Sequence, residues 1–388
     1  MGDFVVRRAS RVFGYPQAGP LAVVVQDGLV LAVVPDADVD NDTHWDLPEL
    51  DAGGRAVIPG FVDAHTHLVF AGDRCDEFEA RLAGRPYAAG GIMGTVSATR
   101  AATFDELVDG VVARADAALA TGSTTIEVKS GYGLDTAHER RLLEAVAAAG
   151  ARTAVELVPT FLGAHLAPDP SYVDLVIDEM LPACAGLARS CDAFCDEGAL
   201  TVDQARRVLE AGRLHGLAPR IHAEELARTG GARLAAELHC LSADHLVHAD
   251  QADAWALAEA GVVAVLLPAT SFSLRSGYAP ARMLADAGVT LALATDCNPG
   301  TSNTTSMPFV IALACSAYGL TPDEAVRAAT EGGAKALGRG DIGHLRPGAR
   351  ADLVVLDTDR WADLAYRPGM PLVGAVVKGG HVVYPCVP

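Results

Sequence analysis

Long apolar runs are absent from this 388-residue sequence. No uninterrupted apolar stretch approaches the roughly 18 residues that a membrane-spanning helix needs. The first residues, MGDFVVRRAS, also lack the apolar run of a signal peptide. These absences argue against an integral membrane protein and favour a soluble protein of the cytoplasm.

Positive charge is scarce as well. The formal net charge is −19, and no tract of lysine or arginine occurs. This argues against nucleic acids and anionic membrane surfaces as partners. The acidic excess is explained by a solubilising surface, and an anionic substrate would need a local cation to bind.

The eight cysteines include no CxxC pair, so they predict a reduced compartment rather than a disulfide framework. Aromatic residues are few, whereas alanine and glycine are abundant. Alanine-rich stretches suit closely packed amphipathic helices better than a β-sandwich. The cysteines are Cys75, Cys184, Cys191, Cys195, Cys240, Cys297, Cys315 and Cys386.

Short β-branched runs alternate with alanine-rich segments through the middle of the chain. Thr103, followed three residues later by Glu106, has the capping-box pattern of a helix start. Several segments end where a helix C-terminus favours a residue that tolerates positive φ, at Gly122, Gly150, Gly216, Gly261 and Gly288. The eight runs are AVIPGFVDAH (56–65), TTIEVKS (124–130), RTAVELVPTF (152–161), CDAFCD (191–196), RIHAE (220–224), ADHLVH (243–248), VVAVLL (262–267) and TLALATD (290–296).

Strands that alternate with helices predict a parallel sheet, and eight such units over roughly 250 residues match an α/β fold of the (β/α)8 TIM-barrel type. A doubly wound open sheet is the alternative, but no GxGxxG motif follows the first strand.

Both ends of the chain are rich in β-type residues. LAVVVQDGLVLAVV (21–34) is typical of a hairpin, and ADLVVLD (351–357) and VGAVVKGGHVVYP (373–385) resemble strands with a Gly-Gly turn. We predict a small β-sandwich domain built from residues 1–55 and 341–388, beside a catalytic barrel of residues 56–340.

In a barrel of this kind the active site lies at the carboxyl ends of the strands. His65 and His67 lie two apart on the first strand, so both imidazoles share one face, with Cα atoms roughly 6–7 Å apart. Two nitrogens at that spacing can bind one ion at about 2.0–2.1 Å. An isolated HxH would be explained by a buried structural histidine, but His222 and Asp296 end other strands and complete a metal set.

A His3Asp set is a hydrolytic site if one position stays open for water, and a bound divalent ion can lower the pKa of that water to about 7. Asp296 is then also a proton shuttle. His245 can bond the same water or the developing oxyanion, unless it only packs behind the ligands. Lys129 is better explained as a structural ion pair than as a carboxylated bridge between two metals, so we predict one ion.

These motifs together resemble the amidohydrolase superfamily and, within it, the imidazolonepropionase family. HxH alone marks only the superfamily, whereas the joint presence of GDR, KSGYGL, LGAH and DxNPGT is more specific. The resemblance extends over nearly the whole chain. Its segments are IPGFVDAHTHLVFAGDR (58–74), EVKSGYGL (127–134), TFLGAHLAP (160–168), IHAEEL (221–226), SADHL (242–246), ATDCNPGTS (294–302) and the C-terminal PGARADLVVLD.

The resemblance implies hydrolysis of the cyclic amide of 4-imidazolone-5-propanoate to N-formimidoyl-L-glutamate by a metal-activated water. It implies one Zn²⁺ or iron ion per subunit and a homodimer, with His65, His67, His222 and Asp296 as metal ligands. Asp296, His245 and Glu225 would be catalytic. The implied substrate contacts are Arg74, Tyr132, His165, Glu225, Asn298, Gly300 and Thr301.

Each implied substrate contact has a structural alternative. Arg74 could clamp a carboxylate in bidentate fashion or pair at the surface with Asp73 or Asp76. Tyr132 could only pack, and His165 could be a satisfied histidine at the rim. Glu225 could be a charge at a helix N-terminus, and residues 298–301 could be only a turn. The resemblance favours the functional interpretation of each.

Three rival functions remain open. A deaminase of a heterocyclic base shares the histidines and the aspartate but needs no carboxylate clamp, so Arg74 and Tyr132 discriminate against it. A hydantoin or dihydropyrimidine ring opener typically uses two metals and a carboxylated lysine. A catalytically inactive binding protein would lack metal ligands, and none is missing here.

Overall fold

Eight parallel strands form the centre of the computed structural model, which describes residues 2–17, 19–40, 47–84, 91–169 and 171–385. They are neighbours in chain order, from β7 to β14. The strands are β7 (Phe61–Asp63), β8 (Ser123–Lys129), β9 (Glu156–Ala164), β10 (Ser190–Cys195), β11 (Ala218–Ala223), β12 (Ser242–His245), β13 (Val263–Leu266) and β14 (Leu291–Leu293).

The first and last strands of this sheet meet just beyond their carboxyl ends. Thr66 and Cys297 form a parallel bridge. On either side of it, His67 N donates to the Cys297 carbonyl and Asp296 N donates to the His65 carbonyl, both at 3.0 Å. This contact closes the sheet. The predicted (β/α)8 barrel is therefore confirmed, and the doubly wound alternative is wrong.

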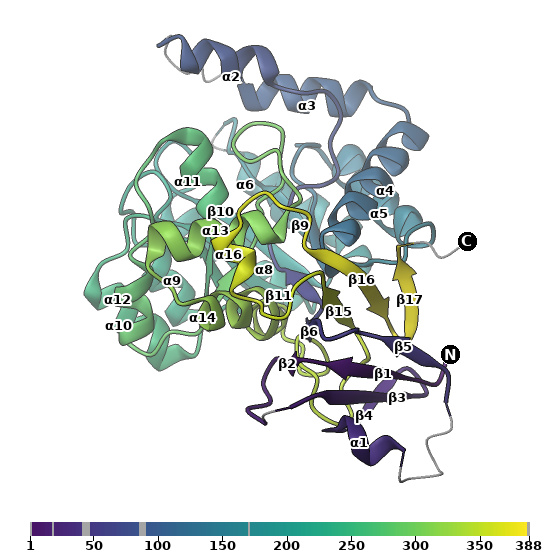
Figure 1. Ribbon diagram of the computed structural model, residues 1–388. Coiled ribbons are helices and arrows are strands. Elements are labelled where there is room, and N and C mark those ends of the chain that lie inside the picture. Colours follow the sequence, from purple (N-terminus) through teal and green to yellow (C-terminus); the bar gives the residue numbers. More distant parts are fainter. Residues whose placement is uncertain (1, 18, 41–46, 85–90, 170, 386–388) are drawn as a thin grey trace.

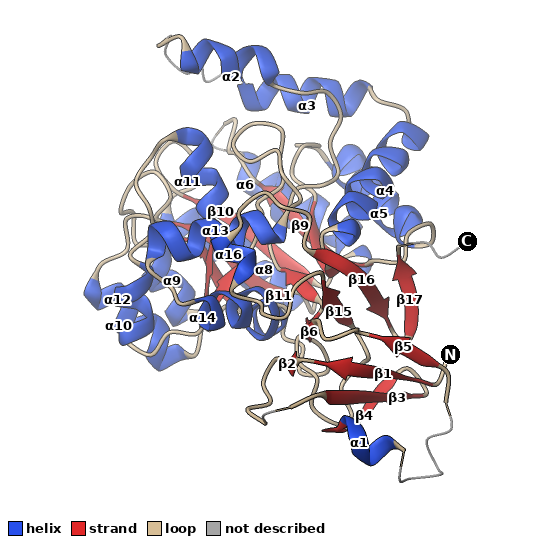
Figure 2. Ribbon diagram, viewed as in Figure 1, coloured by secondary structure: helices blue, strands red, loops and turns tan. Residues whose placement is uncertain are grey.

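Helices surround the strands on the outside, and α2 and α3, which follow the first barrel strand, lie apart from the rest at the top of the view (Figures 1 and 2). Shorter π-helical and 3₁₀ segments occupy residues 176–180, 185–187 and 328–332. The helices are α2 (Cys75–Leu82), α3 (Gly91–Ala101), α4 (Phe104–Ala120), α5 (Thr136–Gly150), α6 (Tyr172–Leu175), α7 (Leu181–Cys184), α8 (Val202–Leu214), α9 (Gly231–Glu237), α10 (Gln251–Ala260), α11 (Pro268–Leu274), α12 (Ala281–Asp286), α13 (Met307–Tyr318), α14 (Pro322–Arg327), α15 (Gly333–Ala336) and α16 (Asp363–Tyr366).

Helix ends follow the sequence signals with one exception. Thr103 caps α4, and the reciprocal bonds with Glu106 form the predicted capping box. Gly261 ends α10 with a left-handed φ of 69°. Gly150 does not act this way, because it is the last helical residue of α5 and Ala151 caps the helix in a right-handed conformation. The prediction for Gly150 is therefore wrong.

The two ends of the chain pair in two further sheets, seen at the lower right of Figure 1. Their apolar faces are buried together. The predicted hairpin is confirmed, since β3 and β4 are antiparallel. The sheet orders are β4-β3-β1-β5 and β17-β16-β15-β6-β2. Their elements are β1 (Phe4–Ala9), β2 (Arg11–Val12), β3 (Leu21–Gln26), β4 (Leu29–Pro35), α1 (Asp36–Val39), β5 (Glu49–Asp51), β6 (Ala56–Pro59), β15 (Leu353–Leu356), β16 (Val373–Lys378) and β17 (His381–Tyr384).

The run at residues 56–65, expected as one strand, is divided between two sheets. Its first part, β6, pairs antiparallel with β15 of the terminal sheet. Its second part, β7, pairs parallel with β8 of the barrel. Gly60 joins them where a Cβ atom would lie 2.4 Å from the side chain of Thr124. A single strand cannot satisfy both partners, so the chain bends at this glycine.

No helix among the described residues is long and apolar enough to cross a membrane. The seven cysteines in the described part of the chain are all free thiols, in agreement with the absence of a disulfide framework. Cys386 lies outside the described residues. The boundaries proposed for the small domain and the barrel stay a prediction.

Candidate metal and substrate site

The four predicted metal ligands meet at the carboxyl ends of three barrel strands. His65 and His67 follow β7, His222 lies in β11, and Asp296 follows β14. All four side chains are almost completely buried. Strands that are distant in the sequence thus bring the set together, as the barrel predicts.

Three imidazoles of this set could share one ion. One ring nitrogen from each of His65, His67 and His222 lies within 4.8 Å of the other two. Nε2 of His65, Nε2 of His222 and Nδ1 of His67 are buried and have no hydrogen-bond partner among the described residues. Leaving such atoms unpaired is costly. A bound cation would take the Nε2 lone pairs of His65 and His222 directly.

Asp296 places a carboxylate oxygen beside the same group. Its Oδ1 lies 3.6 Å from Nε2 of both His65 and His67. Two ligand atoms bound to one ion at about 2.0–2.1 Å in a tetrahedral arrangement are roughly 3.3–3.5 Å apart. The residues therefore fit a divalent ion. The other oxygen of Asp296 accepts a hydrogen bond from the hydroxyl of Thr270 at 2.5 Å.

Burial sets the charge state of the site. It lowers the pKa of His65 and of His67 well below the usual value, which favours the neutral imidazole that binds metals. Burial alone would lower the pKa of His222, but the carboxylate of Asp192 outweighs it and raises the value. Burial also raises the pKa of Asp296 to about 6 in the metal-free protein.

Two buried carboxylates face the Nδ1 atoms of His65 and His222. Asp244 Oδ2 lies 2.6 Å from Nδ1 of His65, and Asp192 Oδ1 lies 3.1 Å from Nδ1 of His222. A carboxylate at Nδ1 holds the proton there and leaves Nε2 free for a ligand bond. Neither aspartate carried a predicted role.

His245 ends β12 beside the three histidines. Its ring lies 5.5 Å from that of His65 and 5.3 Å from that of His222, centroid to centroid. Its Nε2 lies 3.6 Å from Glu225 Oε2. Burial raises the pKa of Glu225 to about 8, and Asp296 acts in the same direction. A protonated Glu225 can donate a hydrogen bond as well as accept one.

Several residues with strained backbone conformations lie at this end of the barrel. Left-handed φ angles occur at Glu224 (57°), His245 (77°), Leu246 (56°) and Asp296 (52°). Such conformations are costly for residues with a Cβ and persist where the surroundings enforce them, often at active sites. Glu225 is in a bend before α9 rather than at a helix N-terminus, so its structural alternative is not borne out.

The loop with Tyr132 is held by a buried carboxylate that the sequence did not reveal. Glu139, in α5, accepts hydrogen bonds from the backbone N–H groups of Gly131, Gly133 and Leu134 at 2.7–2.9 Å. The Tyr132 ring is thereby placed 5.9 Å from His67 and 5.5 Å from His165, between centroids.

His165 is part of the same wall. Its Nδ1 donates to the carbonyl of Gly131 at 3.0 Å, and its ring stacks on His67 with centroids 5.2 Å apart and planes at 16°. Burial lowers the pKa of His165 to about 4. A neutral imidazole with one nitrogen satisfied keeps its other nitrogen for a ligand.

Arg74 immediately precedes α2 and makes a two-point ion pair, but with a different acid from those expected. Its Nε and Nη2 donate to Glu77 at 2.9 and 2.7 Å, not to Asp73 or Asp76. Its Nη1 faces the Cα of Gly300, where a Cβ would lie only 2.0 Å away. The guanidinium therefore lies against the 298–301 loop at the rim of the site.

That loop is built by its own asparagine. The Oδ1 of Asn298 accepts from the N–H groups of Gly300 and Thr301 at 2.9 and 2.8 Å, and its Nδ2 donates to the carbonyl of Asp296 at 2.7 Å. Arg81 also donates to the carbonyl of Gly300 at 3.0 Å. The turn is confirmed as a structure, and substrate contact from it stays a prediction.

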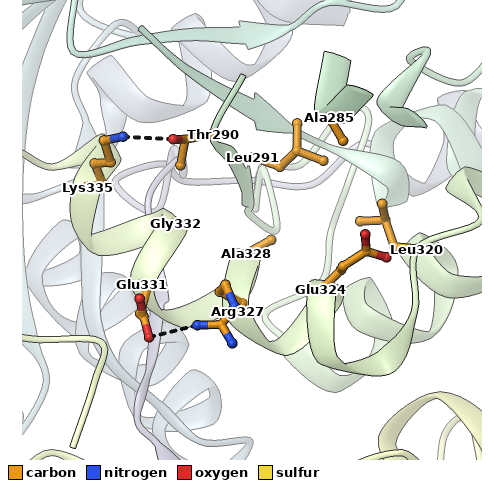
Figure 3. A pocket seen from close by; sticks show the side chains of 10 residues that line it. All are labelled: Ala285, Thr290, Leu291, Leu320, Glu324, Arg327, Ala328, Glu331, Gly332 and Lys335. Carbon is orange, nitrogen blue, oxygen red and sulfur yellow. Dashed lines mark hydrogen bonds and ion pairs between the residues drawn. The ribbon is translucent and has the colours of Figure 1, made fainter. Parts of the chain in front are cut away.

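A separate pocket lies at the amino end of β14, where Thr290 and Leu291 line it (Figure 3), whereas Asp296 follows the carboxyl end of that strand. Its charged side chains are paired with near neighbours. Lys335 donates to Thr290 at 2.7 Å, and Arg327 donates to Glu331 at 3.2 Å. No predicted site residue lines it. We therefore assign the chemistry to the histidine cluster and not to this pocket.

A family model described as "Amidohydrolase family" matches residues 56–383. Solved structures with the same fold include 5-methylcytosine deaminase from Klebsiella pneumoniae, with a TM-score of 0.79, 17% identity, and coverage of 98% of this chain and 97% of that one. An adenosine deaminase from Xanthomonas campestris with bound zinc gives a TM-score of 0.75, 24% identity, and coverage of 98% and 92%. The fold and the histidine cluster thus define a hydrolase, and the chain belongs to the amidohydrolase family.

More similar relatives are named imidazolonepropionase. The protein from Mycolicibacterium smegmatis is 50% identical over 95% of this chain and 93% of its own length. The protein from Streptomyces coelicolor is 56% identical over 85% of each chain. Within the amidohydrolase family, the chain accordingly groups with the imidazolonepropionases, as the motifs predicted.

Proposed function

We propose that this enzyme hydrolyses the lactam of 4-imidazolone-5-propanoate to N-formimidoyl-L-glutamate. The observation that carries the proposal is the identity of 50–56%, over 85–95% of this chain, to proteins named for that activity. The site supports it, because a metal-binding histidine cluster, a carboxylate and a rim arginine suit one ring amide and one carboxylate. The ring carbonyl would become the α-carboxylate of the product.

The metal-binding residues are His65, His67, His222 and Asp296. A divalent ion held by them supplies an activated water and polarises the lactam carbonyl. Zinc suits this set, and iron suits it nearly as well. One ion per subunit agrees with strand β10, which contains no lysine to bridge a second one.

Proton transfer is assigned to Asp296. Its carboxylate takes the proton of the attacking water and passes it to the ring nitrogen that leaves. His245 donates to the oxyanion that develops on the former carbonyl. Glu225, 3.6 Å from His245, orients that imidazole and bonds a ring N–H of the substrate.

Substrate orientation is assigned to the wall and rim of the site. Arg74 binds the propionate, with its guanidinium held against Gly300. Tyr132 and His165 flank the ring, and Asn298, Gly300 and Thr301 complete the substrate contacts beside Arg74. This fixes the carbonyl at attack distance, which lowers the entropic part of the barrier. We also propose a cytoplasmic homodimer.

The direct test is an assay on purified protein with known metal content. Loss of imidazolone propionate should match the formimidoylglutamate formed, with about one ion per chain. The Asp296→Asn variant keeps the shape and one oxygen facing Thr270, so it should fold, and we expect it to lose about 10²–10⁴-fold in kcat. Turnover near the wild-type value would refute the role of Asp296.

A heterocyclic-base deaminase is the second candidate, because solved deaminases share the fold. Such an enzyme releases ammonia and leaves the ring closed. Ammonia release from adenine- or cytosine-type bases without ring opening of imidazolone propionate would replace the proposed function with this one.

A further inference from the structure

Lys129 is one of only three lysines in the chain, and it is completely buried at the end of β8. Its ammonium lies 2.7 Å from Asp192 Oδ2 and 2.9 Å from Glu127 Oε1. A third carboxylate, that of Asp244, is 3.8 Å away. A buried ammonium among three carboxylates is a costly arrangement unless each charge is compensated.

Two of those carboxylates are the partners of metal-binding histidines. Asp192 faces Nδ1 of His222, and Asp244 faces Nδ1 of His65. Lys129 therefore joins two aspartate–histidine pairs that come from separate strands. Each imidazole needs a fixed ring plane and a fixed tautomer to direct Nε2 at one ion.

Arg220 shares the compensation of Asp244. Its Nη2 lies 3.4 Å from Asp244 Oδ2, nearer than the ammonium of Lys129 at 3.8 Å. Two buried cations therefore compensate the carboxylates of Glu127, Asp192 and Asp244, and Lys129 is the one that reaches Asp192.

Lys129 is also unable to serve as a carboxylated bridge. Carboxylation would convert its ammonium to an anion less than 3 Å from Asp192 and Glu127. Like charges at that distance repel strongly in a buried environment. The ammonium form is the one that its neighbours stabilise.

We propose that Lys129 is a positioning residue of the metal site: its ammonium donates a hydrogen bond to Asp192 and lies beside Asp244, and so holds the two carboxylates that orient His222 and His65. This inference rests on the proposed metal-dependent function and adds a residue that contacts neither ion nor substrate.

The test measures Zn²⁺ affinity by competition with a chromogenic chelator, together with metal per chain. We expect Lys129→Met to bind Zn²⁺ about 10- to 100-fold more weakly than wild type, and Asp192→Asn to do the same. Because both residues act on His222, their effects should not add: the double variant should bind Zn²⁺ only slightly more weakly than the weaker-binding of the two single variants. Lys335→Met is the matched control, since Lys335 lies in the pocket of Figure 3 and should leave affinity unchanged.

The outcomes separate the inference from the function on which it rests. Wild-type protein that binds no metal would refute the proposed function itself. Wild type that binds one ion while folded Lys129→Met binds it equally tightly would overturn the role of Lys129, even if thermal stability of the metal-free protein fell. Two equivalents per wild-type chain would refute the single ion of the proposed function. If Lys129→Met fails to fold, Asp192→Asn and Asp244→Asn decide by the same affinity criterion.

Discussion

The carboxylate of Glu139 offers the sharpest test of how the fold prepares the substrate site. It is completely buried and accepts hydrogen bonds from the N–H groups of Gly131, Gly133 and Leu134. Glu139→Gln keeps the shape but leaves one oxygen for three donors. At least one charge-assisted hydrogen bond is lost, and the new amide N–H₂ faces a backbone N–H.

The expected loss of stability follows from those bonds. A hydrogen bond to a charged group contributes about 1.5–3 kcal/mol. Burial raises the pKa of Glu139, so removing the charge recovers part of that loss. We expect the free energy of unfolding to fall by about 1–2 kcal/mol at pH 7.

The functional effect should be local to the Tyr132 loop. We expect kcat/KM to fall about 10- to 100-fold, because small displacements of a positioning group have effects of that order. Metal per chain should not change, since Glu139 accepts its hydrogen bonds from Gly131, Gly133 and Leu134 and not from a metal ligand. Glu144→Gln on the same helix is the control, because Glu144 pairs with Arg140 at the surface.

Urea unfolding and steady-state kinetics measure both effects. If Glu139→Gln retained the stability and the kcat/KM of the wild type, the carboxylate would not be what holds the loop. A parallel loss of bound metal would show that the change is not local, and would refute the reasoning equally.

Three further predictions concern the rim, the ion and the joint between the sheets. Arg74→Ala should raise KM about 10- to 100-fold with kcat largely kept, as expected for a lost two-point contact with a carboxylate; an unchanged KM would assign Arg74 a structural role. Removal of metal by a chelator should abolish turnover, and Zn²⁺ at about 100 times its Kd should restore it and add about 2.7 kcal/mol to the free energy of unfolding; full activity of metal-free protein would contradict this. Burial by itself raises the pKa of Glu156, but its bonds to Arg339 and Arg350 outweigh this and lower it to about 2. A lowered folded-state pKa stabilises the protein above the ordinary value near 4.5 and loses that effect as pH falls towards 2, so Glu156→Gln should cost about 1–2 kcal/mol at pH 7 after allowance for partial exposure. The difference from wild type in urea unfolding should shrink from pH 5 to pH 3, and a constant difference would assign it to packing.

Local signals in the sequence predicted most of the fold. The capping box at Thr103 and the C-terminal Gly261 act within one turn of a helix, so their effect needs no tertiary partner. Gly150 shows the limit, because helix α5 simply includes it and ends one residue later. The break at Gly60 was also missed, because two different sheets compete for one apolar run and only their arrangement decides where each begins.

The site was predicted only as far as strand ends could be recognised. The spacing of His65 and His67 places both on one face of a strand whatever surrounds them. The sequence did not reveal the roles of three buried carboxylates, those of Asp192, Asp244 and Glu139. A charged residue inside a strand or helix is expected to face solvent until its neighbours are known. Arg74 was recognised as a rim cation, but its ion-pair partner was not.

The sequence alone therefore determined the order of strands and helices and the chemical types at the strand ends, since these follow from local periodicity and from residue identity. Only the tertiary structure decided how the charges are compensated. Closure of the barrel brings the carboxylates of Asp192 and Asp244, on two other strands, to 2.7 and 3.8 Å from the ammonium of Lys129. In a buried site the stability of each charged group depends on the presence of the others. The local sequence pattern does not show such dependence between distant positions.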